Sequence, residues 1–413
     1  MPVANSNLTT DRPTFVTHLE CGLEGDSYPA DQIHGLSKAG RPLLVRYDLE
    51  ALKAKVTREQ LASRPADLWR YREFLPVRET RNIVSLGEVH TPLIRLSNLE
   101  TGGELWTKDE GRLPTGSFKA RGLCMAVSMA KELGLKRQAM PTNGNAGAAM
   151  AAYATHAGME SYVFCPEDTP EVNVREIAAQ GAHVWRVNGL INDCGKIVGQ
   201  GKEPMGWFDL STLKEPYRIE GKKTMGLELA DQFGWQTPDV IFYPTGGGTG
   251  LIGMWKAFNE LKQMGWLTDP LPRMVAVQAA GCAPIVKAFD DGSRHADLWP
   301  DAHTIASGIR VPVAVGDFLI LDAVRESNGF ATSVTDDQIQ SALQEVSAKE
   351  GFLMCPEGAA TYAAWKLAVE EGRITGSDRC VLFNCATGLK YPLPPADAKL
   401  DCTQPIDFSS LKK

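Results

Sequence analysis

The stretch "DVIFYPTGGGTGLIGMWKAFNELKQMG", residues 239–265, leads from an apolar strand through a glycine-rich turn into an amphipathic helix. Apolar residues recur on one face of this helix at the helical spacing, namely Leu251, Met254, Trp255 and Phe258. The turn itself contains Gly246, Gly247, Gly248, Thr249 and Gly250. Main-chain N–H groups of such a turn can surround a phosphate at the N-terminus of the following helix. The stretch therefore predicts a strand–turn–helix unit with a phosphate site, and a tight turn without a ligand is the simpler alternative.

The kind of phosphate depends on what surrounds the turn. Gly248, Gly250 and Gly253 match GxGxxG, but a dinucleotide fold needs an acidic residue at the end of the next strand, and "RMVAVQ" ends in Gln278. The GK[ST] of a Walker loop is missing. A small monophosphate therefore fits the loop better than NAD or ATP.

Outward from this unit, β-rich runs alternate with helical patterns. We expect helices at 118–134, 145–158, 173–181, 224–234, 249–265 and 358–372, and strands at 138–142, 161–166, 183–189, 239–245, 273–278 and 380–385. This rhythm predicts parallel βαβ units in two α/β blocks. The polar stretch 199–224 separates them without clear periodicity and is interpreted as a crossover or an active-site loop. The first 60 residues are polar and irregular, which indicates an arm packed onto the body.

Composition excludes several classes of protein. The 413 residues suffice for two globular domains, and 43% of them are hydrophobic. A net charge of -7 without a basic block argues against nucleic-acid binding. Because no apolar run reaches a membrane span and no signal-peptide pattern is present, we expect a cytoplasmic protein with no membrane contact. Nine cysteines without CxxC pairing and seven histidines without metal spacing indicate reduced, buried thiols and no metal site.

Lys119 stands in "LPTGSFKARG", residues 113–122, at the start of an expected helix. A solvated lysine is the ordinary interpretation, but Thr115 and Ser117 are N-cap residue types, and the helix dipole disfavours a cation there. Such a lysine has a lowered pKa and becomes a better amine nucleophile. In "TNGNAGAAMAAYA", residues 142–154, Asn145 either caps a helix or bonds a ring oxygen. The lysine, the phosphate loop and this asparagine together point to pyridoxal phosphate.

Four ordered motifs carry a resemblance to a known family, namely "PTGSFKARG" (114–122), "TNGNAGAAMAAYA", "PTGGGTG" (244–250) and "GLKYP" (388–392). Over residues 84–392 the chain resembles the threonine synthases, in the fold-type II (tryptophan synthase β-like) family of pyridoxal phosphate enzymes. The resemblance implies two open-sheet α/β domains with the cofactor in the cleft between them. It implies an N-terminal arm at 1–60, a large cofactor-binding domain at 61–118 and 206–395, a smaller inserted domain at 119–205, and a C-terminal tail at 396–413.

The resemblance also implies roles for individual residues. Lys119 would carry the cofactor as an internal aldimine and act as acid and base, Phe118 would flank it, and Asn145 would meet the pyridine 3′-oxygen. The turn Gly246 to Gly250 would hold the 5′-phosphate, and Ala306, Ser307 and Gly308 would lie against the ring. Substrate contacts would come from Ser117, Thr142, Lys214 and Arg218, of which Arg218 would grip a phosphate bidentately, with Lys222 nearby.

Some positions depart from the family pattern. Cys385 stands where the family has a threonine that bonds the pyridine nitrogen, and Thr387 follows two residues later, so either the thiol or the hydroxyl serves. A neutral group there leaves the ring nitrogen largely unprotonated. Ala120 stands where an aspartate commonly follows the lysine. Cys21 alone remains of the paired cysteines found in some relatives, which argues against a zinc knuckle.

The implied activity is that of a carbon–oxygen lyase acting on phosphates, which converts O-phospho-L-homoserine and water to L-threonine and phosphate in threonine biosynthesis. A homodimer is expected from the same likeness. One alternative is a pyridoxal phosphate-dependent ammonia-lyase, dehydratase or racemase acting on serine, threonine or a related amino acid. Another is a non-catalytic module that binds a phosphate ligand. Glu357, in "CPEGAAT" (355–361), either caps a helix or orients a substrate amine.

Overall fold

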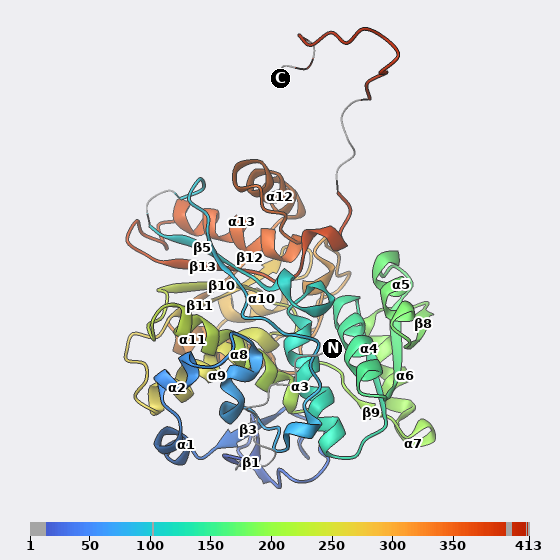
Figure 1. Cartoon of the computed structure of the whole chain (residues 1–413), viewed down its shortest axis with the longest axis vertical. Coiled ribbons are helices and arrows are strands. Elements are labelled where there is room, and N and C mark those ends of the chain that lie inside the picture. Colours follow the sequence, from blue (N-terminus) through green and yellow to red (C-terminus); the bar gives the residue numbers. More distant parts are fainter. Residues whose placement is uncertain (1–13, 101–102, 394–398, 410, 412–413) are drawn as a thin grey trace.

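A computed structural model describes residues 14–100, 103–393, 399–409 and 411, and it contains two open parallel sheets with helices around them (Figure 1). The larger sheet has the order β12 (Phe330–Val334), β11 (Arg273–Ala279), β10 (Val240–Pro244), β13 (Cys380–Asn384), β5 (Leu105–Asp109) and β4 (Leu93–Arg95). Only β4 in this sheet runs antiparallel to its neighbour. The expected α/β class is confirmed.

The smaller sheet has the order β8 (His183–Val187), β7 (Glu160–Pro166), β6 (Arg137–Pro141) and β9 (Phe208–Asp209), all parallel. Its helices are α4 (Asn145–His156), α5 (Glu171–Ala179), α6 (Ile191–Gln200) and the short α7 (Lys202–Met205). Because β9 pairs with β6, this sheet includes Phe208 and Asp209. The division into domains that the resemblance implied stays a prediction.

The remaining helices cover the larger sheet or join the two parts. They are α3 (Lys119–Glu132), α8 (Tyr217–Gln232), α9 (Thr249–Gln263), α10 (Pro284–Asp290), α11 (Asp317–Glu326), α12 (Asp336–Glu350) and α13 (Pro356–Glu370). Strands β10 and β13 are buried along their whole length, as expected for a parallel sheet with helices on both faces. Helix α3 packs against α8 on one side and α4 on the other, so it links the two sheets.

Two segments that the sequence suggested to be irregular contain regular secondary structure. The N-terminal arm contains an antiparallel sheet of β1 (Val16–Cys21), β2 (Ser27–Tyr28) and β3 (Leu43–Tyr47), followed by α1 (Leu49–Lys55) and α2 (Arg58–Ala62). The stretch 199–224 is not one loop, because it contains α7, β9 and the first two turns of α8.

The polar start of α8 is helical because its charges are paired inside the protein. Lys223 contacts Glu220 at 2.7 Å and Glu260, on α9, at 2.9 Å, and neither Lys223 nor Glu220 is exposed. Tyr47 of the arm donates its hydroxyl to Glu220 at 2.7 Å. The start of α8 therefore lacks the hydrophobic periodicity of an amphipathic helix, although it is buried.

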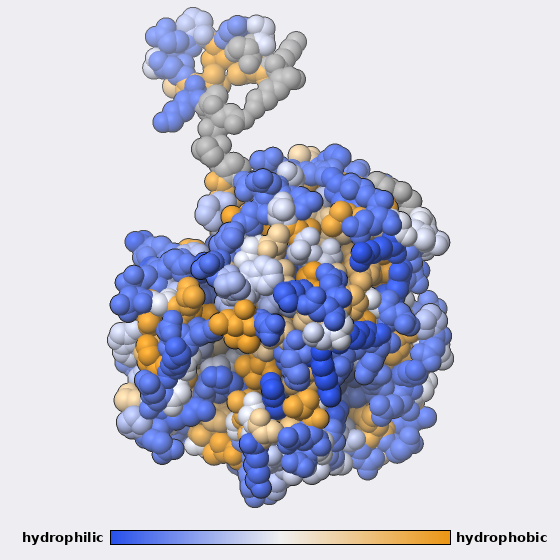
Figure 2. Space-filling model, turned by 180° about the vertical axis from the view of Figure 1, so that it is seen from behind, coloured by the Kyte–Doolittle hydropathy of each residue, from blue (hydrophilic) through white to orange (hydrophobic). Residues whose placement is uncertain are grey.

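The surface and the ends complete the picture. Seen from behind, the body is covered mostly by hydrophilic side chains, with hydrophobic residues in small groups among them (Figure 2). Residues 399–409 extend away from the body and are exposed (Figure 1). All nine cysteines are free thiols, and all except Cys402 are buried. Within the described ranges, no helix combines the length and apolar character needed to cross a membrane.

Candidate active site

A cavity of about 450 Å³ opens at the carboxyl ends of strands from both sheets. Its wall includes Thr142 after β6, Gly246 after β10 and Cys385 after β13. Crevices at this edge of parallel sheets are the usual ligand sites of open α/β folds. The expected site residues that line it are Phe118, Lys119, Thr142, Asn145, Lys214, Gly246, Gly247, Gly248, Thr249, Ser307, Gly308 and Cys385.

The glycine turn exposes its main chain to this cavity directly before α9. A Cβ at Gly247 would lie 2.8 Å from Cγ2 of Thr212, and Gly248 has a φ of +71°, which favours glycine. Gly250 must be a glycine for a different reason, since a Cβ there would lie 1.9 Å from the hydroxyl oxygen of Tyr243. Gly250 is not part of the cavity wall. Gly246 to Thr249 therefore form a main-chain cradle at a helix N-terminus, which suits a phosphate.

Lys119 is the first residue of α3 and lies in the cavity wall. Its Nζ is 3.9 Å from the centroid of the Phe118 ring. Loss of hydration, together with the charge of Arg218, lowers the pKa of Lys119 to about 8. A larger fraction of this amine is therefore unprotonated at neutral pH than of an ordinary lysine.

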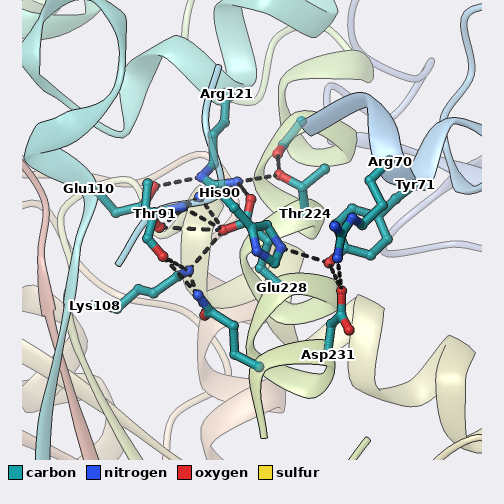
Figure 3. Close-up of polar contacts among 12 residues, drawn as sticks. Arg70, Tyr71, His90, Thr91, Lys108, Glu110, Arg121, Thr224, Glu228 and Asp231 are labelled. Carbon is teal, nitrogen blue, oxygen red and sulfur yellow. Dashed lines mark hydrogen bonds and ion pairs between the residues drawn. The ribbon is translucent and has the colours of Figure 1, made fainter. Parts of the chain in front are cut away.

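A buried network holds the start of α3 in place, and its centre is Arg121, two residues after Lys119 (Figure 3). Arg121 binds Glu110 at 2.6 and 2.9 Å and Glu228 of α8 at 2.8 Å, and none of these three side chains is exposed. Lys108 adds a second contact to Glu228 at 2.8 Å. Although burial opposes it, Arg121 and Lys108 hold the pKa of Glu228 below its usual value. The two cations and two carboxylates compensate one another, which a buried charge requires.

Asn145 begins α4 and faces the same cavity. Its Nδ2 donates to the hydroxyl of Tyr391 at 3.3 Å, while its Oδ1 is buried and has no hydrogen-bond partner among the described residues. Glu357, left open by the sequence, is in the wall and accepts the Gly308 N–H at 2.7 Å.

The structure separates the two candidates for the pyridine nitrogen. Cys385 lies in the wall, and burial raises the pKa of its thiol far above the usual value, so it remains a neutral thiol. Thr387 is not in the wall. Its hydroxyl accepts a hydrogen bond from the N–H of Leu389, and its main chain pairs with Met354. Cys385 is thus the residue that is brought to the site.

Of the four residues expected to contact the substrate, some line the cavity and others do not. Thr142 and Lys214 line the cavity, although the Thr142 hydroxyl is also used by the N–H groups of Gly144 and Gly147, each at 3.0 Å. Ser117 is buried behind the wall.

Arg218 is not in the wall, contrary to the role expected for it. It is 1% exposed, and its Nη1 donates to the Leu210 carbonyl at 2.8 Å and contacts Thr212 at 3.4 Å. It supports the turn that carries Ser211 and Thr212, which do line the cavity. The wall also contains residues that the sequence did not indicate, namely Asn143, Asn192, Lys196, Ser211 and Thr212. A hydroxyl pair directly after a short strand was the available signal for Ser211 and Thr212.

These residues fit the cofactor that the motifs implied. The glycine cradle offers main-chain donors where a side chain would collide with Thr212, and Asn145 in the wall gives one N–H to Tyr391, which leaves its second N–H for a ring oxygen. Lys119 supplies an amine of lowered pKa in the same cavity. The glycine cradle matches the phosphate of pyridoxal phosphate, Asn145 matches its ring oxygen, and Lys119 matches its aldehyde carbon.

Comparison with known proteins agrees with this fit. Residues 84–386 match the family described as pyridoxal-phosphate dependent enzyme. The chain is 37% identical over 372 residues to a threonine synthase of Methanocaldococcus jannaschii, which covers 89% of this chain and 91% of that protein. It is 35% identical over 393 residues to a threonine synthase of Methanosarcina acetivorans, covering 94% and 95%.

Solved structures share the architecture. Maize serine racemase matches with a TM-score of 0.63 at 21% identity, over 78% of this chain and 90% of that chain. Threonine deaminase isoform 2 of Solanum lycopersicum matches with a TM-score of 0.63 at 19% identity, over 84% and 94%. At these identities the likeness shows the fold alone. The expected cofactor is confirmed by the family. The chain therefore belongs to the pyridoxal-phosphate dependent enzymes, within their threonine synthase family.

Proposed function

We propose that this enzyme converts O-phospho-L-homoserine and water to L-threonine and phosphate. The observation that carries the proposal is one cavity with two kinds of anion-binding group, in a chain similar to threonine synthases. In its wall the glycine cradle adjoins the turn that carries Ser211, Thr212 and Lys214, with Thr212 against Gly247. A substrate with its own phosphate needs a second such set beside that for the cofactor phosphate.

Lys119 is the group that we expect to move protons. When bound, pyridoxal phosphate withdraws electrons and so acidifies substrate carbons next to it. Elimination of phosphate from the γ-carbon and addition of water at the β-carbon require proton transfers at neighbouring carbons. The Lys119 amine, with its pKa lowered to about 8, suits both giving and taking protons near neutral pH.

Arg218 supports this site indirectly in our proposal. Its contacts to Leu210 and Thr212 hold the turn whose hydroxyls face the cavity, and its charge keeps the Lys119 pKa low. We therefore assign substrate-phosphate contact to Lys214, Ser211 and Thr212. Arg218→Ala is expected to reduce turnover of O-phosphohomoserine far more than it reduces cofactor loading.

A dehydratase, ammonia-lyase or racemase is the rival, since those enzymes have this fold and cofactor chemistry. The test is to incubate the purified holoenzyme with O-phosphohomoserine, threonine and serine in parallel, and to quantify threonine, phosphate and 2-oxoacid. We expect threonine and phosphate in equal amounts from O-phosphohomoserine. Release of 2-oxoacid from serine or threonine as the main activity would favour the rival.

A non-catalytic module is tested by colour and by covalent labelling. Holoenzyme reduced with borohydride is expected to carry the cofactor mass on the peptide that contains Lys119, and Lys119→Ala is expected to carry none. We further propose a cytoplasmic homodimer, on the grounds of the relatives and the sequence. Light scattering of the purified enzyme tests the homodimer.

A further inference from the structure

A chain of hydrogen bonds crosses the edge of the cavity and joins four segments that are distant in sequence. The Gly308 N–H donates to Glu357 Oε1 at 2.7 Å, the Tyr391 hydroxyl donates to Glu357 Oε2 at 2.7 Å, and Asn145 Nδ2 donates to the Tyr391 oxygen at 3.3 Å. Gly308, Glu357 and Asn145 line the cavity, whereas Tyr391 does not. Tyr391 also lies outside residues 84–386, the part that matches the family.

The direction of each bond in this chain follows from its neighbour. A carboxylate can only accept, so the hydroxyl of Tyr391 must donate to Glu357. Burial and the charge of Glu357 raise the pKa of Tyr391 well above its usual value, so the hydroxyl keeps its proton. The Tyr391 oxygen is then left as an acceptor, which only the N–H side of the Asn145 amide satisfies. The amide oxygen, Oδ1, consequently has to point elsewhere, and it is buried without a hydrogen-bond partner among the residues that the structure describes.

The segment that carries Tyr391 is held by independent contacts. Lys390 makes an ion pair with Glu176 of α5 at 2.6 Å and donates to the Thr115 carbonyl at 3.1 Å. These contacts tie residues 390 and 391 to the smaller-sheet side and to the segment just before Lys119. Tyr391 is therefore held where its hydroxyl links the Glu357 carboxylate on α13 to the Asn145 amide on α4. The direction of the first hydrogen bond sets the direction of the second.

We propose that Tyr391 is a positioning residue that sets which edge of the Asn145 amide faces the cofactor. This rests on the proposed role of Asn145 at the cofactor's 3′-oxygen. One N–H of the amide is committed to Tyr391 and Oδ1 is buried, so the remaining N–H is the donor that we assign to the cofactor. Asn145 alone could rotate by half a turn at little cost, because its oxygen and nitrogen have similar shape. The Glu357–Tyr391 pair removes that freedom.

Two substitutions disrupt this chain of hydrogen bonds in different ways. Tyr391→Phe deletes the bridging oxygen and keeps the ring. Glu357→Gln keeps the size of the side chain but can present an N–H to Tyr391, which reverses the direction of the chain and calls for Oδ1 of Asn145 as the new acceptor. Each variant is expected to alter the visible absorption and circular dichroism of the bound cofactor. Each is also expected to speed cofactor release from the holoenzyme about tenfold, and to lower kcat more than it changes KM.

The two effects are expected not to add. The double variant Tyr391→Phe/Glu357→Gln should match the larger single effect, because both changes act on one chain. Tyr162→Phe is the matched control: its hydroxyl donates to Glu160 at 2.5 Å, outside the cavity, and its cofactor spectrum should equal that of the parent. The melting temperature of each variant shows whether it folds, and Glu357→Gln, being isosteric, keeps the test independent of how Tyr391→Phe folds.

A parent-like cofactor spectrum and release rate in Glu357→Gln would overturn the inference. Fully additive effects in the double variant would overturn it too, because they mean that Glu357 acts on the cofactor without Tyr391. Failure of the proposed function has a different signature: the parent would release no threonine from O-phosphohomoserine, while the spectra of the variants would still differ from that of the parent.

Discussion

Lys222 donates a hydrogen bond to the main-chain carbonyl of Phe118, the residue directly before Lys119. Its Nζ lies 3.9 Å from the centroid of the Phe118 ring, the same distance as Nζ of Lys119. Lys222 is fully buried, and burial lowers its pKa well below the usual value, with the charge of Lys119 adding to the effect. The Lys222 amine therefore fixes the backbone from which Lys119 projects.

Lys222→Met is expected to lower kcat about tenfold, since it removes one of two hydrogen bonds to the Phe118 carbonyl, worth about 1 kcal/mol, leaves the Arg121 N–H as its donor, and frees Phe118 to move. Lys222→Gln keeps an N–H donor and should recover most of the activity. Steady-state kinetics on O-phosphohomoserine measure both, with Lys262→Met, in an exposed pair with Asp269, as control. If Gln were no better than Met, the hydrogen bond would not be the cause.

Arg121→Met is expected to destabilise the fold by about 3–5 kcal/mol, because it leaves the buried carboxylates of Glu110 and Glu228 without a guanidinium. The measurement is the midpoint of urea unfolding. Arg175→Met removes an exposed pair with Glu171 and should change stability by less than about 1 kcal/mol. Equal midpoints for the two variants would contradict the importance of the network.

Attachment of pyridoxal phosphate to the apoprotein should accelerate with pH until about 8 and then level off, because the unprotonated Lys119 amine is the reactive form. Arg218→Met should shift this midpoint upward, since the guanidinium charge lowers the Lys119 pKa. Stopped-flow absorbance over a range of pH gives the profile. A parent midpoint near the 10.5 of an ordinary lysine would refute a lowered pKa.

Glu215 links stability to pH. Its carboxyl accepts the N–H groups of Tyr217 and Arg218 at the start of α8, and burial raises its pKa from 4.5 to about 7. Because the folded-state pKa is the higher one, its contribution to stability is full below pH 4.5 and is lost as the pH rises through 7. Relative to the parent, Glu215→Gln should gain about 3 kcal/mol between pH 4.5 and 8.

The check for Glu215 is denaturant unfolding of parent and variant across that pH range. The exposed Glu203 supplies the control, and Glu203→Gln should follow the parent at every pH. A stability difference that is constant with pH would disprove the linkage.

Gly247→Ala should weaken cofactor binding at least tenfold, because the new Cβ would lie 2.8 Å from Cγ2 of Thr212 and narrow the phosphate cradle. Adding Thr212→Ser removes that methyl group and should restore part of the affinity. Gly199→Ala, in a helix with open space around it, is the control and should leave cofactor binding unchanged. Affinity is measured by titrating apoprotein with pyridoxal phosphate.

Local patterns in the sequence were enough to predict the class of fold and several residues that line the cavity. The alternation of apolar strands with amphipathic helices, and the glycines after β10, act over a few neighbouring residues, so they are readable without the tertiary structure. The same holds for Lys119 and Asn145, each of which starts a helix beside a characteristic turn.

Only the tertiary structure decided which polar residues are inside and what they do there. Arg218 and Lys222 occur in a stretch that looks like a polar loop, yet both are buried. Cys385 reaches the cavity and Thr387 does not, although they are two residues apart. Tyr391 meets Asn145 across 246 positions of sequence. A buried polar group needs hydrogen-bond or charge partners, and those partners come from distant segments. The periodicity of the sequence therefore cannot predict which residues they are.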